Sequence, residues 1–395
     1  MRASEVLQRW LGDSWKLDAR LVRRVLGAVD ALVASRQAVL MELARQYPGA
    51  TRVSAPLKAL DRLLSNPRWQ LARERLYAAL WSRLWPSVQP VVAVDWSVLK
   101  RDESLHVLRA AATVGGRALP VWDEVHPRSR YNNPQVHAGF LTALRRLMPP
   151  EQQAILLTDA GFGVPWFRCA EAHGFACIGR LRGWAQIRPA GGEWDDTRGF
   201  DEMPPGRAVD LGVCEIGKTR GHLARVIVHR CPPQGRKHRT LDGRTALTSG
   251  SRAHARSAKE AWVLIVSTTL SHLNAQDIVR HYARRMQIEE SFRDLKDPRH
   301  GAGLRHSLTR SPARLEGLIL LHALASLVAW LRGAMAQRTR EHERLLAHRQ
   351  AARSARSTLS LWRIGWELLK RAWPPPGIPA HDFQRDRLFP WLPGA

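Results

Sequence analysis

The chain has 395 residues, a length that predicts two or three domains rather than one ordinary hydrophobic core. Hydrophobic residues make up 45% and charged residues 24%, which excludes a largely disordered chain. The formal net charge is +26, from 61 Lys and Arg against 35 Asp and Glu, and this excess favours DNA or RNA as a partner. A genome that prefers Arg over Lys is the alternative explanation.

Residues 1–86 are expected to form a helical domain. Apolar residues recur at helical spacing from Leu17 to Gln46, with Arg on the other face, and a second helical patch starts at Pro56 and breaks at Asn66-Pro67. Small basic helical modules often bind DNA. Three polar residues of this patch lie four positions apart and can follow a DNA backbone: Lys58, Arg62 and Asn66. A helical subdomain that only packs is the alternative.

Residues 87–181 carry the pattern of a ribonuclease-H-like core, an α/β fold with a mixed five-stranded sheet. The β-branched run 91–99 predicts a buried strand, and Gly115-Gly116 between two further strand segments predicts a hairpin. An amphipathic helix over 134–148, a strand over 154–163, a helix and another strand follow. This order of strands and helices is the order of that core.

Residues 182–270 are rich in Gly, Pro, Asp and Arg and predict a β-rich insertion domain with a basic loop over 234–259. A strand over 261–269 closes it, and Asn274 or Asp277 can cap the next helix. Residues 271–337 are expected to complete the core, and residues 338–395 to form a helical region that can dimerise. The apolar run 317–331 is too short to cross a bilayer and predicts a buried helix.

The four cysteines point away from metal and disulfide chemistry. Cys169, Cys177, Cys214 and Cys231 form no CxxC pair and have no histidine cluster beside them, so structural zinc and a disulfide framework are not expected. The first residues have no apolar signal core. We therefore expect a protein of the reducing cytoplasm.

Two acidic residues interrupt apolar strands. Asp95 lies inside the run 91–99, and Asp159 ends the run AILL just before Gly161 and Gly163. A buried carboxylate costs several kcal/mol unless it is paired, and a hard divalent cation is one partner that suits its oxygens. A cap or turn role is the alternative for each residue taken singly.

A third acidic residue lies in the segment 281–296. Taken as one helix at about 100° per residue, the segment puts four polar side chains on one stripe about 60° wide: Tyr282, Arg285, Glu289 and Lys296. Three apolar residues fall on a neighbouring stripe and are expected to hold the helix to the core: Ile288, Phe292 and Leu295. Glu290 points about 100° away from Glu289. An ion pair between Arg285 and Glu289 is the alternative.

The pattern Tyr282-x2-Arg285-x3-Glu289-x6-Lys296 matches the Tyr-Arg-Glu-Lys signature of one large family of bacterial insertion-sequence DDE transposases. VVAVDWS resembles the first Asp motif of that family, LLTDAGFG its second, and LSLWRIGWELL its C-terminal helix. The chain resembles the family from about residue 56 to residue 373, least in the middle of the insertion. The family also carries a β insertion between its second Asp and its Glu.

The resemblance implies a catalytic and metal-binding set of Asp95, Asp159 and Glu289 that holds two Mg²⁺ or Mn²⁺ ions, with Asp95 between them. It implies that Tyr282, Arg285 and Lys296 contact phosphates near the cleaved end. Trp262, at the start of the returning strand, resembles a family Trp that stacks on a flipped base, although a core Trp is the alternative.

The function implied is cut-and-paste DNA transposition by a homodimer that binds the terminal inverted repeats of its own element, in the bacterial nucleoid. Two other interpretations remain open. One is a ribonuclease-H-like nuclease that cuts DNA without joining it. The other is a catalytically inactive, domesticated DNA-binding protein.

Overall fold

The computed structural model describes residues 2–85, 89–114, 116–219, 221–232, 248–249, 260–346 and 359–371. Most of the predicted basic loop 234–259 lies outside these residues. The chain forms two compact units: the first comprises Met1–Gln152 and Met286–Ala395, and the second Gln153–Arg285. The predicted domain boundaries stay predictions, and each unit is described by itself.

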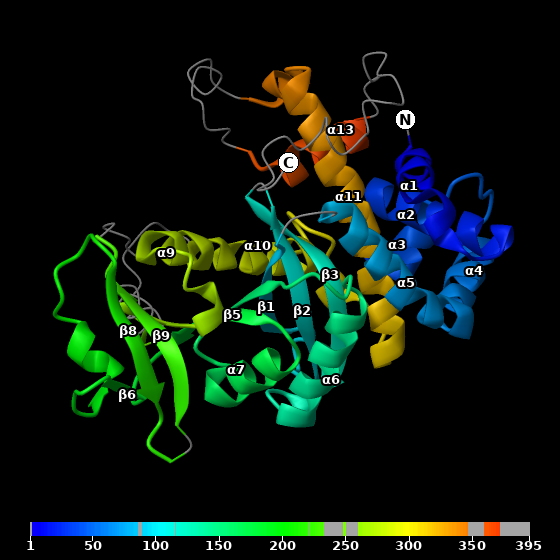
Figure 1. Ribbon diagram of the computed structural model, residues 1–395. Helices are drawn as coiled ribbons and strands as arrows, with labels where there is room; N and C mark the ends of the chain where they lie inside the picture. The colour runs from blue at the N-terminus through cyan, green and yellow to red at the C-terminus, as the bar shows by residue number, and fades with distance from the viewer. Residues whose placement is uncertain are drawn as a thin grey trace. The chain divides into compact units, whose positions relative to one another are not determined.

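The first unit combines an antiparallel sheet with helices (Figure 1). Its strands are β1 Val91–Val98, β2 Leu105–Val114 and β3 Arg117–Pro127. Its helices are α1 Ala3–Leu11, α2 Ala19–Ser35, α3 Leu40–Arg45, α4 Ser54–Leu64, α5 Pro67–Leu84, α6 Pro134–Arg146, α10 Gln287–Lys296, α11 Pro312–Arg338 and α13 Leu361–Arg371. The hairpin expected at Gly115-Gly116 is confirmed, because β2 and β3 pair directly on either side of it.

The core of the first unit is built around α11. By length and composition α11 is the one helix of the described residues that could cross a membrane, yet its apolar window is entirely buried inside the protein. The prediction of a buried helix over 317–331 is therefore confirmed. In Figure 1 α11 runs from the side of β3 and α5 up to α13.

The second unit contains a mixed sheet. Its strands are β4 Ile155–Thr158, β5 Ala176–Leu181, β6 Gln186–Pro189, β7 Asp195–Asp196, β8 Val209–Ile216, β9 His222–His229 and β10 Trp262–Val266, and its helices are α7 Gly163–Ala172 and α9 Ala275–Ala283. Within this unit the strand order is β4-β5-β10-β9-β8-β6-β7. β4 and β5 are parallel, while β10 is antiparallel to both β5 and β9. The α/β class is confirmed.

The segment 281–296 is not the single helix that its sequence pattern predicts. α9 ends at Ala283, a 3-10 turn covers Arg284–Met286, and α10 begins at Gln287. A 3-10 turn has 3.0 residues per turn instead of 3.6, so it shifts the angular phase of everything after it. The boundary between the two units falls inside this turn. The single stripe from Tyr282 to Lys296 is therefore wrong, although its two halves can be treated separately.

Candidate active site

One face of the first unit's sheet carries a row of charged residues. Asp95 on β1 lies directly opposite Arg109 on β2, and Arg109 lies opposite Asp123 on β3. Since alternate residues of a strand share a face, Ser97 lies on the same face as Asp95. Helix α10 packs on this face, because Arg109 donates to the side-chain and backbone oxygens of Ser291 at 3.2 and 3.4 Å.

Helix α10 is held to the sheet by its apolar side. Ile288 and Leu295 are fully buried and Phe292 is 4% exposed, as the sequence pattern predicts. Glu289 and Lys296 are seven residues apart within α10, which puts them on nearly the same side of the helix, about 20° apart. The part of the predicted stripe that lies within α10 is thus retained.

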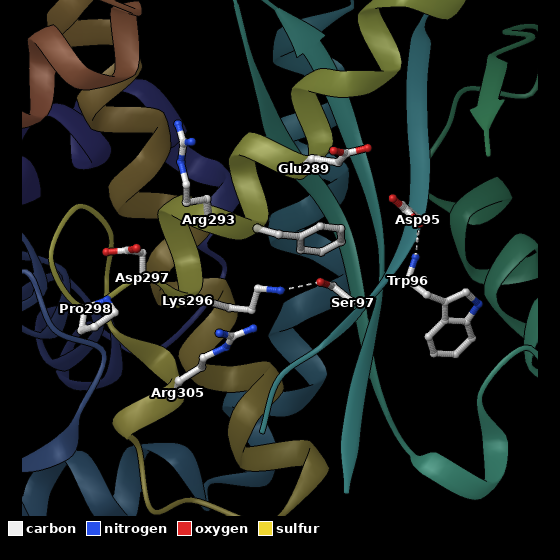
Figure 2. A pocket seen from close by; sticks show the side chains of 10 residues that line it. Asp95, Trp96, Ser97, Glu289, Arg293, Lys296, Asp297, Pro298 and Arg305 are labelled. Atoms are coloured by element: carbon white, nitrogen blue, oxygen red, sulfur yellow. Dashed lines mark hydrogen bonds between the residues drawn. The ribbon is translucent and has the colours of Figure 1, made fainter. Parts of the chain in front are cut away.

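Asp95 and Glu289 line the same cavity, of about 400 Å³. Figure 2 shows them facing one space from two sides, Asp95 from β1 and Glu289 from α10, with Ser97, Lys296 and Arg305 farther along it. The other residues around the cavity are Trp96, Phe292, Arg293, Asp297 and Pro298. Three carboxylates and several cations from distant parts of the chain therefore line one cavity.

Glu290 has different surroundings from its neighbour Glu289. Its carboxylate pairs with Arg117 of β3 at 2.7 Å and also with Arg293. Arg117 pairs in addition with Asp294, at 3.0 Å. Glu290 therefore belongs to a partly buried ion-pair network, and it does not line the cavity that Glu289 lines.

Lys296 is fixed at the cavity by a hydrogen bond from its Nζ to Ser97 Oγ at 2.6 Å (Figure 2). Burial, together with the cations of Arg305 and Arg109, lowers the pKa of Lys296 to about 8, while Asp95 favours the charged form. An ammonium group that loses solvation in this way gains from an anionic partner. A phosphate oxygen is such a partner.

Two of the charged residues on this sheet face, Arg109 and Asp123, form a buried ion pair under α10. Arg109 and Asp123 are both fully buried, and Arg109 Nε donates to Asp123 Oδ1 at 2.7 Å. Tyr77 donates its hydroxyl to Asp123 Oδ2 at 3.1 Å, and Arg73 donates to the Asp123 carbonyl oxygen. Burial raises the pKa of Asp123, against the lowering effect of Arg109. This network ties β2, β3 and α5 together directly beneath α10.

Asp159 lies in the second unit, one residue after β4. Its Oδ1 accepts a hydrogen bond from the Gly161 backbone N–H at 2.9 Å. A Cβ at position 161 would lie 3.1 Å from the same oxygen, so glycine leaves this carboxylate uncrowded. The turn that the sequence predicts after this strand is confirmed.

Tyr282, Arg285 and Trp262 are together in the second unit. The rings of Trp262 and Tyr282 meet edge to face, with centroids 5.1 Å apart, and the guanidinium of Arg285 lies 6.0 Å from the Tyr282 centroid. Burial raises the pKa of Tyr282, Arg285 and Arg180 lower it, and Asp159 raises it. Asp159 is therefore electrostatically close to this group. Tyr282 and Arg285 are only 5% and 8% exposed.

The three N-terminal candidates do not share one helix face. Lys58 and Arg62 are exposed on α4, but α4 ends at Leu64 and Asn66 is the N-cap of α5. The Asn66 side-chain oxygen accepts from the Arg68 N–H at 2.9 Å. The three-residue stripe is corrected for this reason, since Pro67 starts a new helix. DNA contact by these residues stays a prediction.

The donor chemistry of the cavity suits a hard divalent cation, which prefers carboxylate oxygens. Within the first unit Asp95 and Glu289 offer two such groups to one space. Among the residues that the structure describes, no three His, Cys, Asp or Glu side chains gather closely enough to form a metal site. Asp95 and Glu289 therefore supply part, but not all, of the ligands that a divalent cation needs.

The transposase DDE domain family matches residues 86–328. This is more than half of the chain, and the chain belongs to that family: it is a DDE transposase, an enzyme of DNA transposition. Among solved structures it is similar to a cryo-EM structure of a piggyBac transposase synaptic complex with hairpin DNA, at 10% identity and a TM-score of 0.41. That similarity covers 100% of this chain and 83% of the other. No curated protein matches the chain.

Sequence reasoning missed several residues of the cavity. Ser97 could have been found, because it lies two residues after Asp95 on the same strand face. Arg305 had a weaker signal in the basic stretch that follows Lys296. Trp96 carried no signal beyond its neighbour; it lines the cavity, while its indole donates to His137 Nε2 at 3.1 Å.

Proposed function

We propose that this transposase binds the terminal inverted repeats of its own insertion sequence, cuts the DNA at each end and joins the freed ends to a target. One observation carries the proposal: Asp95 and Glu289, 194 positions apart (289 − 95), line one cavity inside the region that matches the DDE family. The Tyr-Arg-Glu-Lys signature supports the bacterial insertion-sequence branch, with a ribonuclease-H-like core.

Asp95, Asp159 and Glu289 are the proposed ligands of two divalent ions, Mg²⁺ or Mn²⁺. DDE transposases generally use such ions. By resemblance, the three carboxylates are the acidic residues of the motifs VVAVDWS and LLTDAGFG and of the Tyr-Arg-Glu-Lys signature. When bound, the ions supply a hydroxide nucleophile and stabilise the departing 3′ oxygen. By resemblance to the family, Asp95 is the proposed ligand of both ions.

The chain's own cations position the DNA strand at the carboxylates. Lys296, held by Ser97 and already poor in solvation, binds a phosphate oxygen beside the cleaved bond. Arg305 at the same cavity binds a second phosphate. In the second unit Tyr282 and Arg285 are mostly buried, so we assign them a contact through one polar edge only. Trp262 is the proposed stacking surface for a flipped base.

The DNA is proposed to be double-stranded at both the element ends and the target, and two copies of the chain to act together. The formal charge of +26 supports a polyanionic partner. Two ends must be cut and joined in one event, and a homodimer presents one active site to each. The C-terminal region 338–395 is one candidate for the contact between copies.

The test uses a linear DNA that carries the sequence flanking the reading frame, incubated with the full-length protein and Mg²⁺. Asp95→Asn should reduce strand cleavage by at least about a hundredfold and leave binding in EDTA unchanged, because the residual binding energy comes from phosphate contacts. Asp61→Asn, at an exposed carboxylate of α4 paired with Arg314, is the matched control and should cleave normally. Cleavage by Asp95→Asn at the wild-type rate would refute the assignment.

Strand transfer separates the transposase from a nuclease. Pre-cleaved ends with free 3′ hydroxyls are mixed with a supercoiled target plasmid in Mg²⁺. The transposase is expected to give joined product. Cleavage of the flanking DNA without any joined product would favour the ribonuclease-H-like nuclease instead.

A further inference from the structure

The segment between α10 and α11, residues 297–311, contributes to the cavity and also carries a large apolar side chain that is exposed to water. Arg305 lines the cavity, and three residues later Leu308 is 92% exposed. Among the exposed large hydrophobic residues of the described chain, Leu308 has the highest exposed fraction. Moving a side chain of this size out of water lowers the free energy, so its exposure indicates a binding surface.

The backbone that carries Leu308 is held on both sides. The buried Lys100 ammonium donates to the Ser307 carbonyl oxygen, and the Thr309 N–H donates to Ser307 Oγ at 3.3 Å. Ser307 itself is 5% exposed. These bonds fix the backbone on either side of Leu308.

The start of the segment is equally well fixed. The Asp297 carboxylate accepts from the N–H groups of Arg299 and His300, both at 2.7 Å. The Ala302 N–H donates to the Asp294 carbonyl oxygen at 2.7 Å. A Cβ at Gly301 would lie 2.2 Å from that same carbonyl, so only glycine permits the close return of the chain. The segment is a preorganised support for Leu308.

Leu308 lies among exposed basic residues of its own segment. Arg310 has an 80% exposed side chain whose only described ion-pair partner, Asp102, is 3.4 Å away, and Arg305 and His306 are exposed. The adjoining end of β3 adds Arg128, whose side chain is 69% exposed, and Arg130. The turn 100–104 connects these residues, because Lys100 donates to the Ser307 carbonyl oxygen and the Arg128 N–H donates to that of Ser104. The same turn carries Asp102 and Glu103, which pair with Arg310 and Arg128, and the basic residues outnumber these two acids.

We propose that this basic surface holds the DNA next to the cleaved bond and that Leu308 inserts between two neighbouring bases. The inference rests on the proposed function, since it takes the Asp95–Glu289 cavity as the place of cleavage. The arginines neutralise phosphates on either side, and Leu308 unstacks one base step as an apolar wedge. Opening that step lets the strand bend from the duplex towards the cavity. A protein partner fits less well, because its surface would have to be strongly acidic.

The test compares Leu308→Ser with Leu71→Ser in the full-length protein. Leu71 is 73% exposed on α5. Because both leucines are mostly exposed, neither change should alter the free energy of unfolding much. The probe is a nicked duplex of about 30 base pairs with 2-aminopurine beside the nick, bound in EDTA at low salt. Its fluorescence rises when the base unstacks.

Wild type and Leu71→Ser should raise the fluorescence on binding, and Leu308→Ser should lose at least about half of that rise while its affinity changes less than about threefold. Leu308→Met should restore the signal, since an unbranched apolar chain can still insert. An unchanged rise with Leu308→Ser, or no binding of the probe by the wild type, would overturn the proposal. Cleavage assays in Mg²⁺ separate the two claims. If wild type cleaves DNA but Leu308→Ser leaves the fluorescence rise unchanged, only the insertion of Leu308 is refuted. If wild type unstacks the base but does not cleave DNA, only the proposed function is refuted.

Discussion

At the scale of single residues, the chemistry of the site depends on how the same residue type is surrounded at adjacent positions. Glu289 and Glu290 are neighbours on α10, yet one lines the cavity and the other is bound by Arg117 and Arg293. A helix turns about 100° per residue, which is enough to place them on different surfaces. Position in the helix, and not acidity, decides which of the two can take part in catalysis.

Lys296 gives a prediction on pH. Its pKa in the folded chain is about 8, below the ordinary value of 10.5 that the unfolded chain regains. Between these values the unfolded chain binds a proton that the folded chain has lost, so this residue makes the free energy of unfolding rise with pH in that window. Lys296→Met removes the titration. Urea denaturation in EDTA at about pH 8 and about pH 10 should show wild type gaining stability relative to Lys296→Met. A constant difference would show that Lys296 keeps its ordinary pKa, a falling one that its pKa is raised, and either would contradict the prediction.

At the scale of elements, the site depends on how α10 is seated on the sheet. Helix α10 contacts the sheet at the fully buried ion pair Arg109–Asp123, and Arg109 also donates a hydrogen bond to Ser291 of α10. A buried ion pair adds little by itself, but removing one partner leaves an uncompensated charge in a low-dielectric interior. The pair therefore acts mainly on the position of α10, and through it on Glu289.

Asp123→Ala is expected to destabilise the protein by about 3–5 kcal/mol, because it leaves the Arg109 guanidinium buried without its carboxylate. Glu103→Ala, which removes the exposed partner of Arg128, should cost less than about 1 kcal/mol. Urea unfolding followed by circular dichroism measures both. Equal small losses for the two variants would mean that the Arg109–Asp123 pair does not hold the structure.

Helices α11 and α13 approach each other at two glycines. A Cβ at Gly333 would lie 1.8 Å from the Leu361 carbonyl oxygen, and a Cβ at Gly365 would lie 1.6 Å from that of Ala329. These carbonyl oxygens belong to the backbone, which cannot move aside as the end of a flexible side chain can. The inner face of α13 is therefore used within the chain, and a contact between copies through the C-terminal region would have to use another face.

Gly365→Ala is expected to cost about 1–3 kcal/mol or more through this overlap. Gly139→Ala is the matched control, since position 139 is an exposed site inside α6 with no atom near its missing Cβ. There alanine should stabilise the helix by about 0.5–1 kcal/mol. Thermal unfolding of the two variants should therefore shift in opposite directions, and a shift in the same direction would contradict the close helix contact.

At the scale of the whole molecule, the sequence predicted those parts of the fold that local pattern decides. The β-branched run at Asp95, the Gly115-Gly116 turn and the buried character of α11 were readable because burial and turn chemistry leave periodic traces. The 3-10 turn at Arg284–Met286 was not, because HYARRMQIEE is compatible with one helix and only tertiary packing ends α9 there. The Gly333–Gly365 approach was equally hidden, since it joins residues that local periodicity cannot relate.

The candidate site divides in the same way. Asp95, Glu289 and Lys296 followed from motif spacing and are brought to one cavity, whereas Ser97 and Arg305 depend on how a strand face and a loop meet α10. The stripe that joined Tyr282 and Arg285 to Glu289 relied on a continuous helix that the chain does not form. Their roles at the DNA stay predictions.

The central claim is that the Glu289 carboxylate serves the cleavage reaction, and two single-atom changes on one helix test it most directly. Glu289→Gln and Glu290→Gln are compared for Mg²⁺-dependent cleavage of DNA carrying the flanking sequence, with binding in EDTA as the control for folding. Glu289→Gln should lose cleavage by at least about a hundredfold while binding is retained, because an amide is a poor ligand for a hard cation. Glu290→Gln should cleave within about threefold of wild type, since Glu290 does not line the cavity and its side chain is bound by Arg117 and Arg293. Normal cleavage by Glu289→Gln, or an equal loss in both variants, would contradict the account.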